Sequence, residues 1–427
     1  MYIFIMIFSC IVDYIHALII DKNRGTFKAK LALISSIFIN LSLLVFFKYS
    51  DFIISILNNS LNTNIPLLQI TLPIGISFYT FQTMSYTIDV YRNNAQVQKN
   101  IISLGTFVTL FPQLVAGPIV RYSDISKDLN HRTHNVDKVY EGIYRFIIGL
   151  SKKIILANNL GIIWISIKTT PFNSLSNLTA WLGIICFTLQ IYFDFSGYSD
   201  MAIGLGKIFG FEFLENFNYP YISQSASEFW RRWHISLGSW FRDYVYFPLG
   251  GSRRGNVRTY INLFIVWFLT GFWHGASWTF IAWGLYFGLL IGMEKSYLGK
   301  LLNKVPRFVR HIYLLLVVMI GWVFFRADSF SYSIEFIKNM FFMGTNVIFD
   351  GVAASYINDY WFVLVLSMIF CMPIVDWFRR KIEVANDKIL ESNISYVLNS
   401  VVYTGILLIV IFKLVNSTYN PFLYFRF

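Results

Sequence analysis

The chain has 427 residues, of which 56% are hydrophobic and only 14% charged, and its formal net charge is +12. A soluble protein would carry about 25% charged residues, and soluble cores stop growing near roughly 300 residues. This composition excludes an ordinary soluble protein and predicts an integral membrane protein. The positive charge is spread over many loops without a recognition motif, which argues against nucleic-acid binding and fits loops that face anionic lipid.

Ten apolar segments predict membrane-spanning helices, because each approaches the roughly 20 residues needed to cross a bilayer. They are residues 1–20, 30–48, 70–90, 141–165, 177–195, 258–274, 276–294, 309–326, 358–377 and 396–416. Segment 101–120 is apolar but interrupted by prolines and a glycine, which predicts a re-entrant or kinked element. Segment 327–345 is predicted to be an amphipathic surface helix. The expected fold class is all-α, a polytopic membrane protein with about 10–11 transmembrane helices.

Basic residues gather in short loops, which predicts the orientation of the chain. The basic loops are residues 21–30, 251–258, 295–310 and 379–388, whereas loops 49–69, 166–176 and 346–357 are nearly neutral. Basic short loops stay in the cytoplasm. The predicted topology therefore alternates across the membrane, with both termini outside.

No polar linker divides the sequence, so we expect a single membrane domain over residues 1–427. Cys10, Cys186 and Cys371 lie far apart within apolar segments and are expected to be buried thiols. The sequence contains no CxxC pair and no phosphate-binding loop. It therefore predicts no metal site and no permanently bound cofactor.

Ionisable residues inside apolar segments are costly and usually functional. Asp194 lies near the end of the predicted span 177–195, and Tyr198 follows four residues later. If the helix continues, the two side chains share one face. The alternative is a helix that simply emerges into the lipid headgroups at this point.

The stretch that begins "SASEFWRRWHISLG" at Ser225 is predicted to start a helix. Ser225 and Glu228 have the spacing of a capping box, and Glu228 can pair with Arg232 one turn later. The segment carries too much charge to span a membrane. We therefore expect a helix that lies in the interface or dips into a protein-lined cavity.

Within this helix, Trp230 and Trp233 are three residues apart, as are Arg231 and His234. A surface helix is the alternative interpretation, in which the arginines meet lipid phosphates and the tryptophans join the aromatic belt. That interpretation accounts for the arginines and tryptophans well. It accounts less well for His234.

His274 lies about 16 residues beyond the basic loop 251–258, or about 24 Å along a helix, deep in or across the membrane. Gly271 and Gly275 flank it, and glycine lets a backbone or a ligand come close. A neutral, buried imidazole suits a general base for acyl transfer. The alternative is a histidine that packs two helices together.

Six ordered motifs resemble the membrane-bound O-acyltransferase (MBOAT) superfamily, and in particular its AlgI-like branch of polysaccharide O-acetyltransferases. The motifs are "FPQLVAGPIVRYSDI" (111–125), "YFDFSGYSDMAIGLGKIFGF" (192–211), "EFWRRWHISLGSWFRDYVYFPLGGSRRG" (228–255), "GFWHGASW" (271–278), "GWVFFRADS" (321–329) and "YNPFLYFRF" (419–427). The densest part of the match covers residues of about 105–295. Family members commonly begin with further hydrophobic segments, so we expect this chain to be N-terminally short relative to the family.

The resemblance implies helices around a central funnel and two catalytic histidines, which fall on His274 and His234. It also implies a bacterial cell-membrane enzyme that takes an acyl group from a cytoplasmic thioester, such as acetyl-CoA. The acceptor would be a hydroxyl of a cell-surface or exported polysaccharide, reached with an SGNH-type extracytoplasmic partner. Residues expected to bind the donor or support the site are Arg231, Arg232, Trp230, Trp233, Trp273, Asp194 and Tyr198.

Two other functions stay open at this point. A DltB-like enzyme, which transfers D-alanine to teichoic acid, shares "FWRRWH" and "FWHG" motifs, although "YVYFPLGGSRRG" and the final "YFRF" favour the AlgI-like branch. A transporter of acyl groups or glycans would carry out no chemistry and would need no particular histidine.

Overall fold

The computed structural model describes residues 2–114, 117–343, 347–385, 393–416 and 422. Every regular element in these ranges is a helix, and one isolated antiparallel bridge joins Phe217 to Trp233. This confirms the all-α fold class expected from the sequence.

The N-terminal part is a group of three packed helices, α1 (Ile3–Lys22), α2 (Phe27–Leu61) and α3 (Ile76–Tyr91). Buried polar side chains join them: Ser36 donates to Asp13 over 2.6 Å and Asn40 donates to the same carboxylate over 2.9 Å. The interrupted segment that follows forms α4 (Ile101–Thr109) and α5 (Phe111–Leu114), so a kinked element is confirmed there. Helix α6 (Tyr122–Asn130) comes next.

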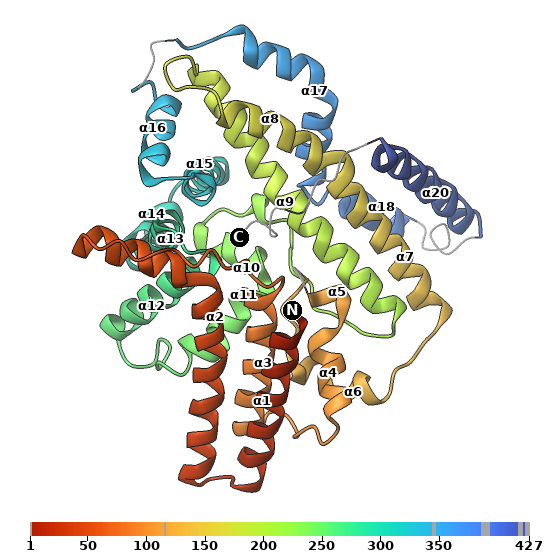
Figure 1. Cartoon of the computed structure of the whole chain (residues 1–427). Coiled ribbons are helices and arrows are strands. Elements are labelled where there is room, and N and C mark those ends of the chain that lie inside the picture. The colour runs from red at the N-terminus through yellow and green to blue at the C-terminus, as the bar shows by residue number, and fades with distance from the viewer. Residues whose placement is uncertain (1, 115–116, 344–346, 386–392, 417–421, 423–427) are drawn as a thin grey trace.

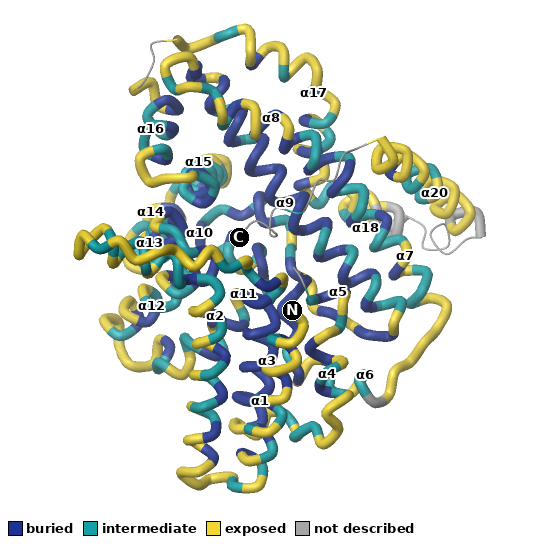
Figure 2. The backbone as a smooth tube through the Cα atoms, viewed as in Figure 1, coloured by how far each residue is buried: buried dark blue, intermediate teal, exposed yellow. Residues whose placement is uncertain are grey.

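The centre of the molecule is α9 (Asn177–Ile208), which packs against α7 (Val136–Ser151), the π-helix η1 (Lys152–Ala157) and α8 (Asn158–Lys168). In the most apolar stretch of α9, 83% of the residues are buried, against 6% in the stretch Tyr396–Val415 of α20 (Asn393–Val415). Figure 2 shows the same contrast between the dark core and the exposed outer helices. The close packing of α7 on α9 requires glycine, because a methyl group on Gly149 would collide with the carbonyl oxygen of Gly197.

The remaining helices complete the molecule around α9 and the N-terminal group. They are η2 (Pro220–Ile222), α10 (Ala226–Arg232), α11 (Ile235–Phe241), η3 (Arg242–Tyr246), α12 (Asn256–His274), α13 (Trp278–Met293), η4 (Glu294–Leu298), α14 (Gly299–Leu302), α15 (Arg307–Arg326), α16 (Phe330–Met340), α17 (Gly351–Phe370) and α18 (Ile374–Ala385). Figure 1 places the short helices α10 and α11 near the middle of the molecule, between the N-terminal group and α9.

Every predicted span contains a helix, and seven helical stretches in the described ranges are long and apolar enough to cross a membrane. They are Ile3–Lys22, Phe27–Leu61, Val136–Lys168, Asn177–Ile208, Arg307–Arg326, Gly351–Phe370 and Tyr396–Val415. The predicted spans 70–90, 258–274 and 276–294 correspond to the shorter or less apolar helices α3, α12 and α13. The boundary of span 358–377 is wrong: α17 ends at Phe370, because Pro373 cannot continue a helix and α18 starts after it.

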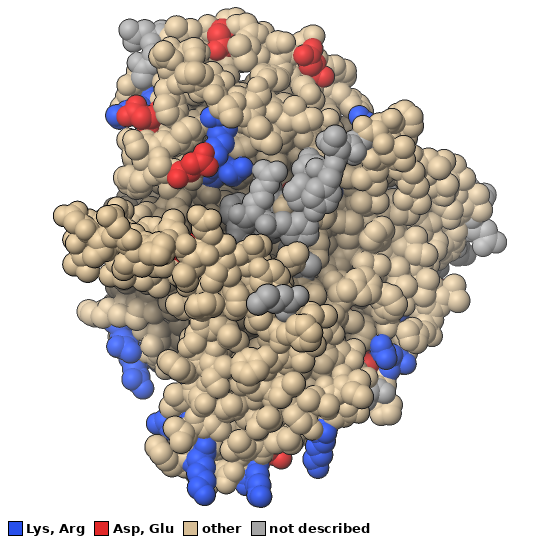
Figure 3. All heavy atoms as spheres, in the orientation of Figure 1, with Lys and Arg blue, Asp and Glu red and all other residues tan. Residues whose placement is uncertain are grey.

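The placement of the cysteines follows the expectation from the sequence. Lys and Arg side chains line the lower edge of the molecule in Figure 3, below the turn that joins α1 to α2 in Figure 1. The predicted surface segment 327–345 contains the 11-residue helix α16. All three cysteines are free and buried, as predicted.

Candidate active site

His274 is the last residue of α12 and is only 5% exposed. Its ring lies among aromatic side chains, 4.9 Å from the ring of Trp283 and 5.3 Å from that of Phe325, both in edge-on contact. The apolar run of α12 carries the chain from the basic loop at Arg258 to this buried position. A base in such surroundings is shielded from bulk water, which favours proton transfer to a bound substrate.

The glycines beside His274 allow two helices to approach each other. A methyl group on Gly271 would collide with the carbonyl oxygen of Phe280, and one on Gly275 would collide with the ring of that residue. Of the two roles that the sequence left open, close packing of backbone is therefore the one observed. It brings α13, and with it Trp283, against the end of α12.

His234 lies in a break between two short helices, where the sequence predicted one continuous helix. Ser225 caps the first helix as predicted, with its hydroxyl accepting from the Glu228 amide over 3.1 Å. However, α10 ends at Arg232, and His234 adopts a left-handed backbone with φ of 45° before α11 begins. The ring is 2% exposed, so the surface-helix interpretation is wrong.

Segment 216–218 causes this break by pairing with the backbone around His234. The Asn218 amide donates to the Arg232 carbonyl over 2.9 Å, and the Ile235 amide donates to the Asn216 carbonyl over 3.0 Å. The Arg232 carbonyl and the Ile235 amide are thus bonded to another segment. They do not form the hydrogen bonds that would continue the helix. A remote stretch of chain thus decides the local conformation of His234.

Asn216 also orients the ring of His234. Its Oδ1 accepts from the backbone amide of Ser236 over 3.2 Å, which fixes the orientation of the side-chain amide. Nδ1 of His234 lies 3.2 Å from the same oxygen and must therefore be the protonated nitrogen. The lone pair of the neutral ring is then on Nε2. Sequence reasoning missed Asn216, because nothing in its local pattern distinguishes it from an ordinary loop residue.

The two histidines, 40 residues apart in sequence, contact the same indole. The ring of Trp273 lies 6.3 Å from that of His234 and 5.0 Å from that of His274. Its Nε1 donates to the carbonyl of Ser77 over 3.3 Å, which holds the indole against α3. Trp273 thus contacts both rings and links the two histidines to α3.

Trp230 and Trp233 pack α10 into the core. The ring of Trp230 lies 5.0 Å from that of Trp267 and 5.4 Å from that of Trp283, and Trp233 is 2% exposed. Both residues therefore support the wall around His274. Trp283 was missed from the sequence. Its indole is fully buried, and no acceptor among the described residues contacts its N–H.

Arg231 and Arg232 differ in their surroundings. Arg231 is exposed, whereas Arg232 donates to Glu228 over 3.1 Å and to the Asn218 carbonyl over 3.2 Å. The start of α10 is held by Glu294, which accepts from the Ala226 amide over 2.6 Å. Since Glu294 directly precedes the basic segment 295–310, the start of α10 lies beside that segment.

Asp194 and Tyr198 lie on α9 and contact the π-helix η1 and the C-terminal region. Asp194 forms a buried salt bridge of 2.5 Å with Lys153. The Tyr198 ring lies 4.9 Å from Phe422, over which Lys153 is also placed, 4.7 Å from the ring centroid. The side chain of α9 that contacts His234 is Phe195, whose ring lies 4.7 Å away.

The fold and this site define a class: a helical membrane protein with two buried histidines on one indole. Residues 44–334 match the model of the MBOAT, membrane-bound O-acyltransferase family, and the chain belongs to that family. It is 46% identical to a probable alginate O-acetylase AlgI of Pseudomonas aeruginosa, over 73% of this chain and 61% of the relative.

Two further relatives extend the match. A probable alginate O-acetylase AlgI of Pseudomonas putida is 39% identical over 91% of this chain and 83% of its own length. A peptidoglycan O-acetyltransferase of Helicobacter pylori is 34% identical over 79% and 70% of the two chains. The match with the Pseudomonas aeruginosa relative spans less than two thirds of that protein. These relatives are bacterial, and the chain is a multi-pass membrane protein.

Proposed function

We propose that this protein is a membrane O-acyltransferase that moves an acetyl group from a cytoplasmic thioester towards the hydroxyls of a cell-surface or exported polysaccharide. The observation that carries the proposal is the pair of buried histidines on one indole, with the tautomer of His234 set by Asn216. Family membership supports acyl transfer, and the names of the relatives support acetyl as the acyl group and a polysaccharide as its acceptor.

The proposed reaction begins when His274 removes the proton of the acceptor hydroxyl as its oxygen attacks the thioester carbonyl. The C–S bond then breaks, and the departing sulfur takes the proton from the imidazolium. His234, whose ring contacts the same indole, is proposed to support the transition state. The buried indole N–H of Trp283, beside His274, is our candidate donor to the oxyanion.

The donor is proposed to be acetyl-CoA or another acyl thioester that arrives beside the basic segment 295–310. Arg231 is exposed and belongs to the helix that starts there, so its guanidinium is a candidate contact for donor phosphates. Arg232 is a weaker candidate because Glu228 already engages it. On the opposite side, an SGNH-type protein is proposed to deliver the acetyl group to the polymer.

Deleting the gene in its own host, with plasmid complementation, tests this proposal. Ester-linked groups are released from the isolated surface polysaccharide by mild base, and both acetate and D-alanine are quantified. Loss of acetate that the plasmid restores supports the proposal. Loss of D-alanine instead establishes the D-alanyl transferase. Unchanged esters with altered polymer export would overturn the enzyme and favour a transporter.

A further inference from the structure

Two consecutive side chains of α2 bind the end of the helix that carries His274. The last carbonyls of a helix have no partner within it. Tyr49 donates its hydroxyl to the carbonyl of Phe272. Lys48 Nζ donates to the carbonyls of Trp273 over 2.6 Å and of His274 over 3.3 Å. Three successive carbonyls are thus held by residues more than 220 positions away in sequence.

Lys48 directs its charge at neutral oxygens. Its remaining hydrogen bond goes to the hydroxyl of Ser77 over 3.1 Å, and its Nζ lies 5.7 Å from the ring centroid of Trp273. In the part of the chain that the structure describes, Lys48 forms no salt bridge. The C-terminal end of a helix carries partial negative charge, so the terminus of α12 itself stabilises this cation.

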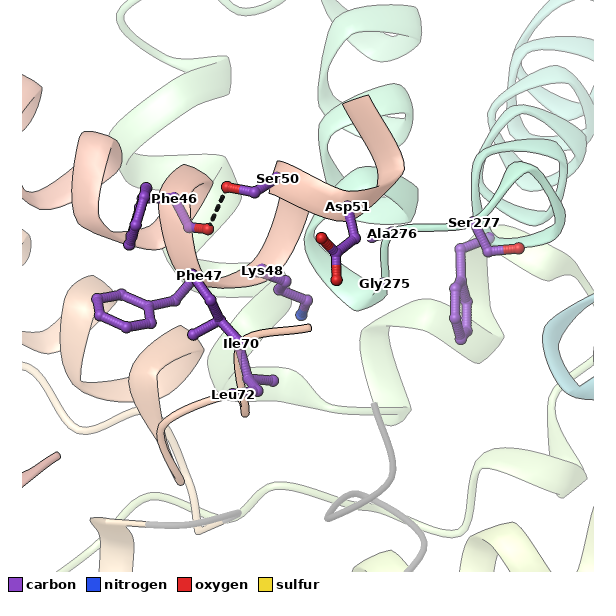
Figure 4. A pocket seen from close by; sticks show the side chains of 11 residues that line it. Phe46, Phe47, Lys48, Ser50, Asp51, Ile70, Leu72, Gly275, Ala276 and Ser277 are labelled. Carbon is purple, nitrogen blue, oxygen red and sulfur yellow. Dashed lines mark hydrogen bonds between the residues drawn. The ribbon is translucent and has the colours of Figure 1, made fainter. Parts of the chain in front are cut away.

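A cavity of about 260 Å³ lies beside this contact. Figure 4 shows Lys48 and Asp51 on α2 facing Gly275 and Ala276, which follow α12. Asp51 is engaged elsewhere, because it accepts from the amide of Leu68 over 2.7 Å. Among the described residues, this cavity borders the end of α12, and the hydrogen bonds from α2 hold the helix end beside it.

We propose that Lys48, assisted by Tyr49, is a positioning residue that fixes the last turn of α12 and so holds the imidazole of His274 in place for acyl transfer. The proposal deepens the proposed function and rests on it. His274 is the final helical residue, and Gly275 continues in an extended conformation. Without the lysine, the carbonyls of Trp273 and His274 lose these hydrogen bonds, and the last turn can fray. A displacement of about 1 Å at a reacting group can cost roughly 100-fold in rate.

Steady-state kinetics in proteoliposomes, with acetyl-CoA as donor, test the role of Lys48. We expect Lys48→Met to lower kcat about 10- to 100-fold while KM for the donor changes less than about 2-fold. Lys48→Arg keeps the charge and donors and should recover most of kcat. Lys30→Met is the matched control, since Lys30 is an exposed lysine on the same helix, and its activity should equal that of the wild type.

Tyr49→Phe should have a smaller effect, about 2-fold in kcat, because Phe272 lies farther from the imidazole and the 4.1 Å ring stack between these residues remains. A wild-type kcat in Lys48→Met would overturn the proposal. So would a loss of activity that matches the loss of folded protein, measured by size-exclusion chromatography, or that Lys48→Arg fails to recover.

Hydrogen exchange separates this proposal from the proposed function, because it needs no substrate. Amides of residues 270–277 should exchange about 10-fold faster in Lys48→Met than in the wild type or Lys30→Met, since the local opening of the helix end becomes easier. Unchanged exchange there would overturn the positioning role even if acetyl transfer is confirmed. If exchange is faster but the protein transfers no acetyl group, the contact between Lys48 and the end of α12 is supported. The proposed acetyl transfer is then wrong.

Discussion

The segments that carry the two histidines differ in what holds them. His274 comes at the end of a 19-residue helix that runs from the basic loop into the core. His234 lies between two helices of 7 residues each, in a left-handed conformation maintained by segment 216–218. One position follows from the length of a helix, and the other from pairing with a remote stretch of chain. A site can therefore contain one residue that is readable from sequence and one that is not.

The two segments also differ in how their rings are oriented. His234 has a specific hydrogen-bond partner in Asn216, whereas the ring of His274 is surrounded by Trp283 and Phe325. The backbone of His274 is in turn held by Lys48. Asn216 therefore sets the tautomer of His234, and aromatic packing encloses the ring of His274.

Removing the ring of His274 is expected to have the largest effect on activity of the variants compared here. We expect His274→Ala to lower acetyl transfer by about 1,000-fold, because general base catalysis contributes about 100- to 10,000-fold. Polymer-bound acetate is measured beside the amount of protein in the membrane. Normal acetylation by a stably inserted variant would remove His274 from the mechanism.

His234→Ala should lower turnover strongly, by about 100-fold, but less completely, because water can replace part of its support. The double variant with His274→Ala should be little worse than His274→Ala alone, since residues that act as a unit are not additive. The same acetate measurement applies. Independent, multiplicative losses would show that the two histidines serve separate steps.

Asn216→Ala isolates the orientation of His234. We expect about a 10-fold loss of kcat, because Nδ1 loses its acceptor and the wrong tautomer becomes accessible. In a His234→Ala background the same change should cost almost nothing. Circular dichroism and gel filtration check the fold, since Asn216 also accepts from Ser236. An equal loss in both backgrounds would mean that Asn216 acts only through the loop.

The smallest effect is expected at the pair between Glu228 and Arg232 beside His234. The pair is partly exposed, and such surface bridges contribute about 0–1 kcal/mol. Arg232→Gln should therefore change activity less than about 3-fold and the thermal midpoint by only about 1–2 °C. A loss comparable to that of Asn216→Ala would assign Arg232 to the donor site after all.

Much of the fold was predictable because membrane helices are encoded locally. Apolar segments long enough to cross a bilayer must satisfy their backbone groups internally, so their positions can be found from composition alone. The boundary at Phe370 was missed because the apolar run continues past it, although Pro373 marks the break. The start of the helix at Ser225 was predicted correctly, but its end was missed. Neither Arg232 nor Trp233 is a residue type that stops a helix.

The sequence by itself determined the membrane class, the helix that carries His274 and the cap at Ser225, because hydrophobicity, helix rise and capping are local properties. Only the tertiary structure decided the left-handed turn at His234, the role of Asn216 and the hydrogen bonds from Lys48 to the end of α12. Each of these depends on hydrogen bonds between segments far apart in the chain. A buried backbone group bonds to whichever partner the fold brings to it, and no local pattern encodes that partner.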